Sequence, residues 1–198
     1  KVSRIVFMIG VVISAFLIPW TKEIIILLLG SQYLEGATVM GIMLLYPIHQ
    51  SLGQINGTMY FALELTRPYV VINSIHLITS IIAIYFLLAP SDIRVPGLGL
   101  GAIGLAMKMV IIQIITVNVS IWWLCRRQGW SFDFAYQIMG IGLFLMLGFL
   151  CYELVNILVD DSVYVLIRAI ISAVIYVLAT IIIFYKLPWF LQINILIA

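Results

Sequence analysis

Six long apolar stretches, separated by short polar breaks, make up most of this 198-residue chain. Lipid cannot hydrogen-bond a backbone, so a segment that crosses it satisfies its own N–H and C=O groups as a helix, and about 20 apolar residues cover about 30 Å of hydrocarbon. We therefore predict an all-α, multi-pass transmembrane helix bundle with six spans. The predicted spans are residues 5–20, 37–63, 69–89, 98–125, 134–159 and 163–185.

The composition excludes a soluble monomer. The chain is 65% hydrophobic and 9% charged, whereas soluble domains carry about 25% charged residues. A soluble monomer of this composition would expose extensive apolar patches. The net charge of +2 does not indicate a nucleic-acid partner, because the basic residues are scattered at the ends of the spans.

The basic residues favour one side of the membrane. Cytoplasmic loops carry the excess of Lys and Arg. When the predicted spans alternate in direction, one side collects only Lys22 and Arg94, with Arg168 just inside the membrane there. The other side collects Lys1, Arg4, Arg67, Arg126, Arg127 and Lys186. We therefore expect both ends of the chain on the cytoplasmic side.

The second predicted span is the most polar. Tyr46, Gln50 and Gln54 recur every four residues and share one stripe of a helix, and Gly53 and Gly57 form a G-x-x-x-G pair on nearly the same face. Polar groups at this depth must face protein or water. Two interpretations stay open: a polar surface that lines a cavity, or side chains that hydrogen-bond to neighbouring helices as packing contacts.

Proline and glycine predict local interruptions and close approaches. Pro47 removes a backbone hydrogen bond and predicts a kink in the second span. Residues 24–29 are too few to cross and predict a shallow helix at the outer interface. In the fourth span, Gly97 and Gly101 form a small-residue step that predicts close helix packing.

Charged residues inside the predicted spans are candidates for function. Lys108 lies about ten residues into the fourth span, where an ammonium group faces a cavity, pairs with an acid or extends to the interface. Gln113 lies further along the same span. Arg168 and Glu153 lie at similar depth in the last two spans, and we predict that they form a structural ion pair.

We expect no catalytic residues, no metal site and no cofactor, and therefore no enzyme. His49 and His76 lack acidic or thiol neighbours at the spacing of metal ligands. Residues 160–161, both Asp, are expected in a solvated outer turn. Cys125 and Cys151 fall near opposite faces of the membrane and are expected as buried thiols, not as a disulfide.

Three segments, taken in their order, resemble a known family. They are the Gly-Ser-Gln-Tyr turn at residues 30–33, the short polar break at 64–68 and the Gly-Ala-Ile-Gly-Leu-Ala segment at 101–106. The order resembles the C-terminal domain of polysaccharide biosynthesis proteins, the oligosaccharide flippases of the MOP exporter superfamily, which also contains the MATE multidrug exporters. We therefore expect such a domain over residues 1–125, followed by two additional spans and a cytoplasmic tail over 126–198.

The resemblance implies a function. The spans would form the C-terminal half of a MATE/MOP flippase-like transporter whose N-terminal part is missing, in line with a start at Lys1. The implied activity is the flipping of lipid-linked oligosaccharide across the bacterial inner (plasma) membrane for synthesis of cell-surface polysaccharide, such as the O-antigen of lipopolysaccharide. The implied partners are a polyprenyl-linked glycan, membrane lipids, a coupling ion and the rest of the chain, with no nucleic acid. The candidate cavity residues are Lys108, for contact with the charged head group, and Gln50, Gln54, Tyr46 and Gln113.

Alternatives remain open. A MATE-type multidrug/cation antiporter would share the fold, because fold alone does not separate such functions. A membrane enzyme of glycan assembly should carry carboxylates or basic clusters in sizeable loops, and here only residues 92–94 and 160–161 offer such groups. A scaffold without a transport role is the third possibility.

Overall fold

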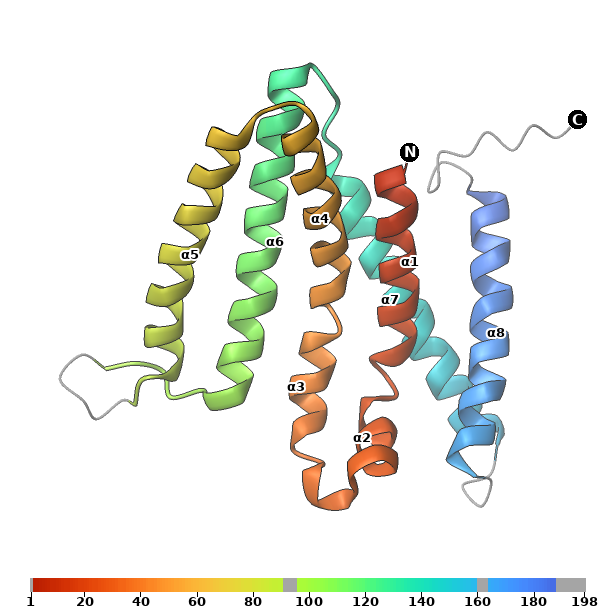
Figure 1. Ribbon diagram of the computed structural model, residues 1–198. Helices are drawn as coiled ribbons and strands as arrows, with labels where there is room; N and C mark the ends of the chain where they lie inside the picture. The colour runs from red at the N-terminus through yellow and green to blue at the C-terminus, as the bar shows by residue number, and fades with distance from the viewer. Residues whose placement is uncertain (1, 91–95, 160–163, 188–198) are drawn as a thin grey trace, which may run out of the picture. The chain divides into compact units, whose positions relative to one another are not determined.

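The computed structural model describes residues 2–90, 96–159 and 164–187, and the described residues form helices and no strands. The helices are α1 (Val2–Leu17), α2 (Thr21–Leu29), the 3-10 helix η1 (Ser31–Tyr33), α3 (Gly36–Met43), α4 (Tyr46–Ala62), α5 (Thr66–Leu88), α6 (Gly101–Gln128), α7 (Phe134–Leu158) and α8 (Val165–Lys186). The helices are labelled in Figure 1. They divide into two compact units. The first unit is Lys1–Leu44 with Ala135–Ala198, and the second unit is Leu45–Phe134.

Four of the described helices, α5, α6, α7 and α8, are long and apolar enough to cross a membrane. The pair α1 and α2 adds a fifth crossing if it is counted as one span with a bend of 73°. The prediction of an α-helical chain is thus confirmed over the described residues, together with the presence of several helices that could cross a membrane. The helix predicted at residues 24–29 is also present, as the second part of α2.

The second predicted span, residues 37–63, is divided into α3 and α4. The break falls just before Pro47, which lies in the first turn of α4. Proline lacks an N–H, and its ring conflicts with the carbonyl of the residue four positions earlier, here Met43, so α3 ends there. With 8 and 17 residues, neither piece is by itself as long as a spanning helix. The count of six spans therefore stays a prediction.

The glycine-rich segment before α6 is a turn, so the prediction of a helix from residue 98 was wrong. Gly99 and Gly101 adopt φ of 58° and 54°, a region that residues with a side chain rarely enter. Gly97 lies outside α6, and a Cβ there would meet the backbone carbonyl oxygen of Ala89. The small residue at 97 therefore lets the turn approach the end of α5, and it does not form the helix-packing step that we expected with Gly101.

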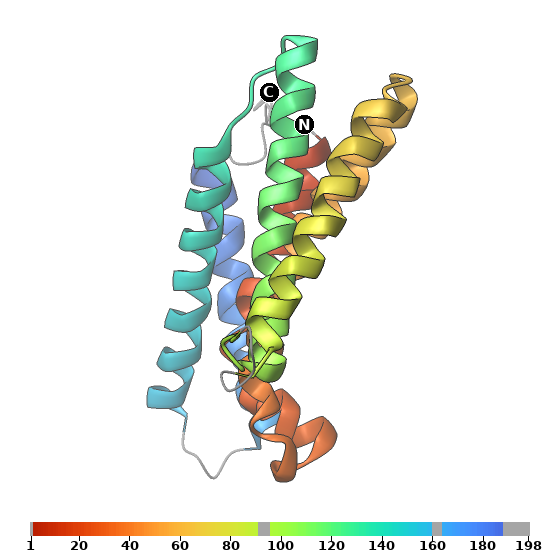
Figure 2. The ribbon, with the colours of Figure 1, turned by 90° about the vertical axis from the view of Figure 1, so that its left-hand side faces the viewer.

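In the first unit, α7 and α8 run in opposite directions (Figure 2). A Cβ on Gly148 would meet the carbonyl oxygen of Ala15, so α7 and α1 approach each other backbone to backbone at this point. The Tyr176 hydroxyl of α8 donates a hydrogen bond to the carbonyl oxygen of Val12 at 3.0 Å. Phe144 is completely buried. The core of this unit thus contains a close approach of α1 and α7 at Gly148, a hydrogen bond between α8 and α1, and buried aromatic side chains.

In the second unit, α4 and α6 run in one direction and α5 in the other (Figure 1). A Cβ on Gly53 would lie 3.0 Å from the Val117 side chain of α6, and one on Gly57 would lie 3.1 Å from the Tyr69 hydroxyl of α5. The G-x-x-x-G pair of α4 therefore lets both neighbouring helices approach, as glycine pairs do in membrane helices. The end of α4, the start of α5 and the end of α6 lie together at one end of this unit.

Some predictions concern residues outside the described part of the chain. They are the outer-side cation Arg94 within the loop at 92–94, the outer turn at 160–161, and the placement of Lys1 and of residues 188–198 at the cytoplasmic side.

Candidate functional site: a polar pocket in the second unit

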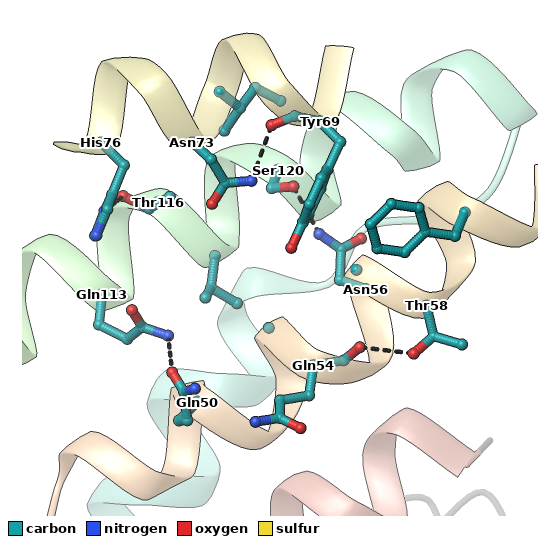
Figure 3. A pocket seen from close by; sticks show the side chains of 15 residues that line it. Gln50, Gln54, Asn56, Thr58, Tyr69, Asn73, His76, Gln113, Thr116 and Ser120 are labelled. Atoms are coloured by element: carbon teal, nitrogen blue, oxygen red, sulfur yellow. Dashed lines mark hydrogen bonds between the residues drawn. The ribbon is translucent and has the colours of Figure 1, made fainter. Parts of the chain in front are cut away.

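A polar pocket of about 390 Å³ lies among α4, α5 and α6 (Figure 3). Its size falls within the usual range of about 300 to 1,000 Å³ for pockets that take small ligands. Most of its lining side chains are neutral and can hydrogen-bond. The polar lining residues are Gln50, Gln54, Asn56, Thr58, Tyr69, Asn73, His76, Gln113, Thr116 and Ser120.

The lining residues follow the periodicity of a helix. On α5, Tyr69, Asn73 and His76 are separated by four and three residues, so they share one face. The corresponding residues of α6 are Gln113, Thr116 and Ser120. Because α5 and α6 run antiparallel and pack side by side, the two polar faces meet across the pocket.

Hydrogen bonds between helices hold the walls of the pocket together. The Gln113 side-chain amide of α6 donates to the Gln50 side-chain oxygen of α4 at 2.7 Å. His76 Nδ1 of α5 shares a hydrogen bond with the Thr116 hydroxyl of α6, also at 2.7 Å. Both interpretations of the polar second span therefore apply: some of its polar groups bond across helices, and the same side chains line a pocket.

Buried contacts support one wall of the pocket. The Asn56 side-chain amide donates to the Ser120 hydroxyl at 2.6 Å, and the fully buried Tyr60 donates to the Ser120 backbone carbonyl at 2.9 Å. The Tyr60 ring stacks on Trp123 with centroids 5.8 Å apart and packs against Tyr69 at 5.4 Å. These contacts fix the positions of two lining residues, Tyr69 and Ser120.

Three of the five predicted cavity residues come together in the pocket, namely Gln50, Gln54 and Gln113. The other two, Tyr46 and Lys108, belong to the described part of the chain and are not among the residues that line it. Lys108 is half-buried on α6 and lies near enough to His76 for an electrostatic interaction.

Several lining residues, including Asn73, Thr116 and Ser120, were not predicted as site candidates. The polar stripes at 69–76 and 113–120 have the spacing of one helix face and could have indicated them. What the sequence does not give is the register that places one stripe opposite the other.

The predicted ion pair belongs to the first unit. The Arg168 guanidinium donates to the Asn156 side-chain oxygen, and Glu153 is exposed. In the same unit, the Tyr152 hydroxyl donates to a carboxylate oxygen of Glu23 at 2.6 Å. Pairing between Arg168 and Glu153 stays a prediction.

The pocket is suited to a neutral, polar ligand. Its lining residues include amides, hydroxyls and one imidazole, and no Asp, Glu, Lys or Arg. Within residues 2–90, 96–159 and 164–187, no three His, Cys, Asp or Glu side chains lie close enough to hold a metal ion. Cys125 and Cys151 are both free and buried, as predicted.

The chain matches no family model, no curated protein and no solved structure. The fold and the pocket therefore define its class: a helical protein with several helices able to cross a membrane, one unit of which encloses a neutral polar pocket.

Proposed function

We propose that this protein is a transmembrane transporter that flips a lipid-linked oligosaccharide across the bacterial inner membrane during synthesis of cell-surface polysaccharide. The observation that carries the proposal is the neutral polar pocket, formed by α4 together with α5 and α6, two helices that are long and apolar enough to cross a membrane. Each sugar hydroxyl both donates and accepts hydrogen bonds, and the side chains of Gln, Asn and Thr offer both kinds of group. The pocket would shield the sugar from hydrocarbon while it crosses.

The charged head group of the ligand requires a different contact. A pyrophosphate is attracted to basic groups, and the lining of the pocket contains no Lys or Arg. Lys108, half-buried on α6 and within electrostatic reach of His76, is our candidate for this contact. In this arrangement the sugar lies in the pocket and the pyrophosphate lies towards Lys108.

The two alternatives are less well supported by the same pocket. A site for organic cations would gain from a carboxylate, and the lining residues include none. An enzyme of glycan assembly would need a positioned acid or base, and the lining offers the His76 imidazole without a carboxylate to orient it.

The sidedness of the proposal can be tested directly. Thr66 begins α5 and Arg126 belongs to the last turn of α6, at the same end of the second unit. From the excess of basic residues we expect that end in the cytoplasm. Cysteines introduced at these two positions should react with an impermeant reagent from the cytoplasmic side alone. Labelling of the two positions from opposite sides would contradict both the layout and the carrier function.

The function itself is tested by transport of a fluorescent polyprenyl-linked oligosaccharide in vesicles that contain the full protein. Gln50→Leu combined with Gln113→Leu should slow flipping about tenfold or more, since each lost hydrogen bond is worth about 0.5 to 1.5 kcal/mol. Gln128→Leu is the matched control, because Gln128 lies at the end of α6 and outside the pocket lining.

Each alternative predicts a different result. If glycan flipping is unchanged in the double variant while efflux of a cationic dye falls, the antiporter alternative is favoured. If purified protein elongates glycan chains, the enzyme alternative is favoured. Unchanged flipping in a folded double variant would remove the pocket from the transport pathway.

A further inference from the structure

An apolar groove of about 170 Å³ lies on the same pair of helices as the polar pocket. Its apolar lining includes Ile75 of α5 and Ile112, Ile115 and Val119 of α6. Ile75 and Ile115 are 59% and 56% exposed, so the groove is open at the surface of helices that are long enough to cross a membrane. Hydrocarbon chains can therefore reach it from the lipid.

The groove and the pocket share part of one wall. Ile72, His76 and Thr116 line both cavities. The hydrogen bond between His76 and Thr116, 2.7 Å long, joins α5 to α6 at the border between the polar and the apolar space. A ligand that filled both cavities would need a polar part and a hydrocarbon chain directly joined to each other.

We propose that the groove holds the hydrocarbon chain of the ligand whose polar part occupies the pocket, with the chain leaving the pocket at the His76–Thr116 pair. This inference rests on the proposed function and adds a specific place for the prenyl chain. The shared lining residues argue for one amphiphilic occupant rather than a separate bilayer lipid, because the polar and apolar surfaces meet at His76 and Thr116.

The groove would bind the prenyl chain through the fit between the shape of the groove and the chain. A prenyl chain is already in hydrocarbon before it binds, so its transfer from lipid to the groove gains little from the hydrophobic effect. What remains is close packing of the chain against the isoleucine side chains and the orientation of the head group that this packing imposes. Blocking the groove should therefore weaken a ligand with a long chain and spare a ligand without one.

The test compares two probes on full-length protein in lipid nanodiscs. One probe is a disaccharide linked through pyrophosphate to a long polyprenyl chain, and the other is the same disaccharide without lipid. Ile115→Trp should weaken binding of the long-chain probe about tenfold, equal to about 1.4 kcal/mol, and leave the soluble disaccharide unchanged. Ile111→Trp is the matched control, since Ile111 is exposed on the same helix and lines neither cavity. Ile75→Trp, on α5, should reproduce the effect of Ile115→Trp.

The possible outcomes separate the two proposals. Unchanged binding of the long-chain probe in both groove variants would overturn the groove assignment, and would leave bilayer lipid as its occupant. Equal weakening of both probes, or equal effects of Ile111→Trp and Ile115→Trp, would overturn it as well. Failure of the unaltered protein to bind either probe would overturn the proposed function together with the groove assignment. If the unaltered protein binds both probes and the groove variants bind them equally well, only the groove assignment is overturned and the proposed function stays in place.

Discussion

The two units of the chain are built from similarly apolar helices, and their interiors differ. In the first unit, α7 meets α1 backbone to backbone at Gly148 and Ala15, and Phe144 is completely buried. In the second unit, buried Asn56 bonds to buried Ser120 in the middle of the helices, beside the polar pocket. Both interiors contain close contacts at glycine, and in the second unit these are combined with hydrogen bonds between polar side chains beside a pocket.

This difference follows from how helices associate in lipid. Without a hydrophobic drive between them, membrane helices associate through close van der Waals packing or through hydrogen bonds between side chains. Packing on glycine brings helices close together, as at Gly148 in the first unit and at Gly53 and Gly57 in the second. In the second unit a hydrogen bond between two long polar side chains, Gln50 and Gln113, also joins α4 to α6, and both side chains line the pocket.

The largest effect is expected where the first unit is tightest. Gly148→Ala places a methyl group against the carbonyl oxygen and carbon of Ala15. The helices must move apart, because both of these Ala15 atoms belong to the backbone and not to a flexible side chain. We expect a loss of about 1 to 3 kcal/mol in the free energy of unfolding, or more. Gly142→Ala is the control on the same helix, since no atom lies within 4 Å of a Cβ at that position. Equal melting temperatures of the two variants in detergent would contradict the close approach of α1 and α7.

A second pair of variants compares the same chemical change in each unit. Tyr60 and Tyr176 are both buried, and each hydroxyl donates to a backbone carbonyl of another helix, at 2.9 and 3.0 Å. Phenylalanine at either position should cost about 0.5 to 1.5 kcal/mol of stability. Tyr60→Phe should also weaken glycan binding, because Tyr60 positions the Ser120 and Tyr69 walls of the pocket.

Tyr176→Phe, in the first unit, should leave glycan binding unchanged. Binding measured beside melting temperature separates the two effects. If both variants change binding equally, the assignment of the ligand to the second unit is wrong.

A double-mutant cycle measures how much one buried hydrogen bond contributes to the stability of the second unit. Asn56→Val and Ser120→Ala each remove one partner of a bond 2.6 Å long. We expect a coupling free energy of about 0.6 kcal/mol, the average for bonds between membrane helices. A cycle that closes with zero coupling would show that the second unit is held by packing at Gly53 and Gly57 instead.

The sequence predicted the helices of this chain better than their interruptions. Four apolar stretches became α5, α6, α7 and α8 nearly as predicted, because length and hydropathy alone decide whether a segment is helical in lipid. Pro47 predicted a kink, and the structure divides the segment into two helices, α3 and α4, separated by Leu44 and Leu45. The glycines before α6 are ambiguous in sequence, since glycine serves helix packing and left-handed turns equally well.

The site was predicted only in part for a different reason. Gln50, Gln54 and Gln113 stood out because polar residues are rare and costly in a spanning helix. Their partners depend on the register between antiparallel helices, and no periodicity within one helix fixes that register. His76 is the example, since its hydrogen bond to Thr116 joins two residues 40 positions apart.

The smallest predicted effect concerns how the helices of the second unit end. The Leu65 N–H donates to the Tyr60 carbonyl and the Glu64 N–H to the Phe61 carbonyl, which together form a Schellman motif after α4. The residue at its left-handed position is Glu64, with φ of 56°, whereas Gly129 occupies the corresponding position after α6, with φ of 70°. Because a side chain is strained there, Glu64→Gly should raise the free energy of unfolding by about 0.5 to 1 kcal/mol.

The control is the same substitution at a position with ordinary backbone geometry. Glu35 is exposed and precedes α3 with φ of −59°, where glycine only adds freedom to the unfolded chain. Glu35→Gly should therefore be neutral or slightly destabilising in thermal melts, while Glu64→Gly melts at a higher temperature than the unaltered protein. If Glu64→Gly melts at a lower temperature, then Glu64 contributes a contact that outweighs the backbone strain, and the two helix ends of the second unit are not equivalent.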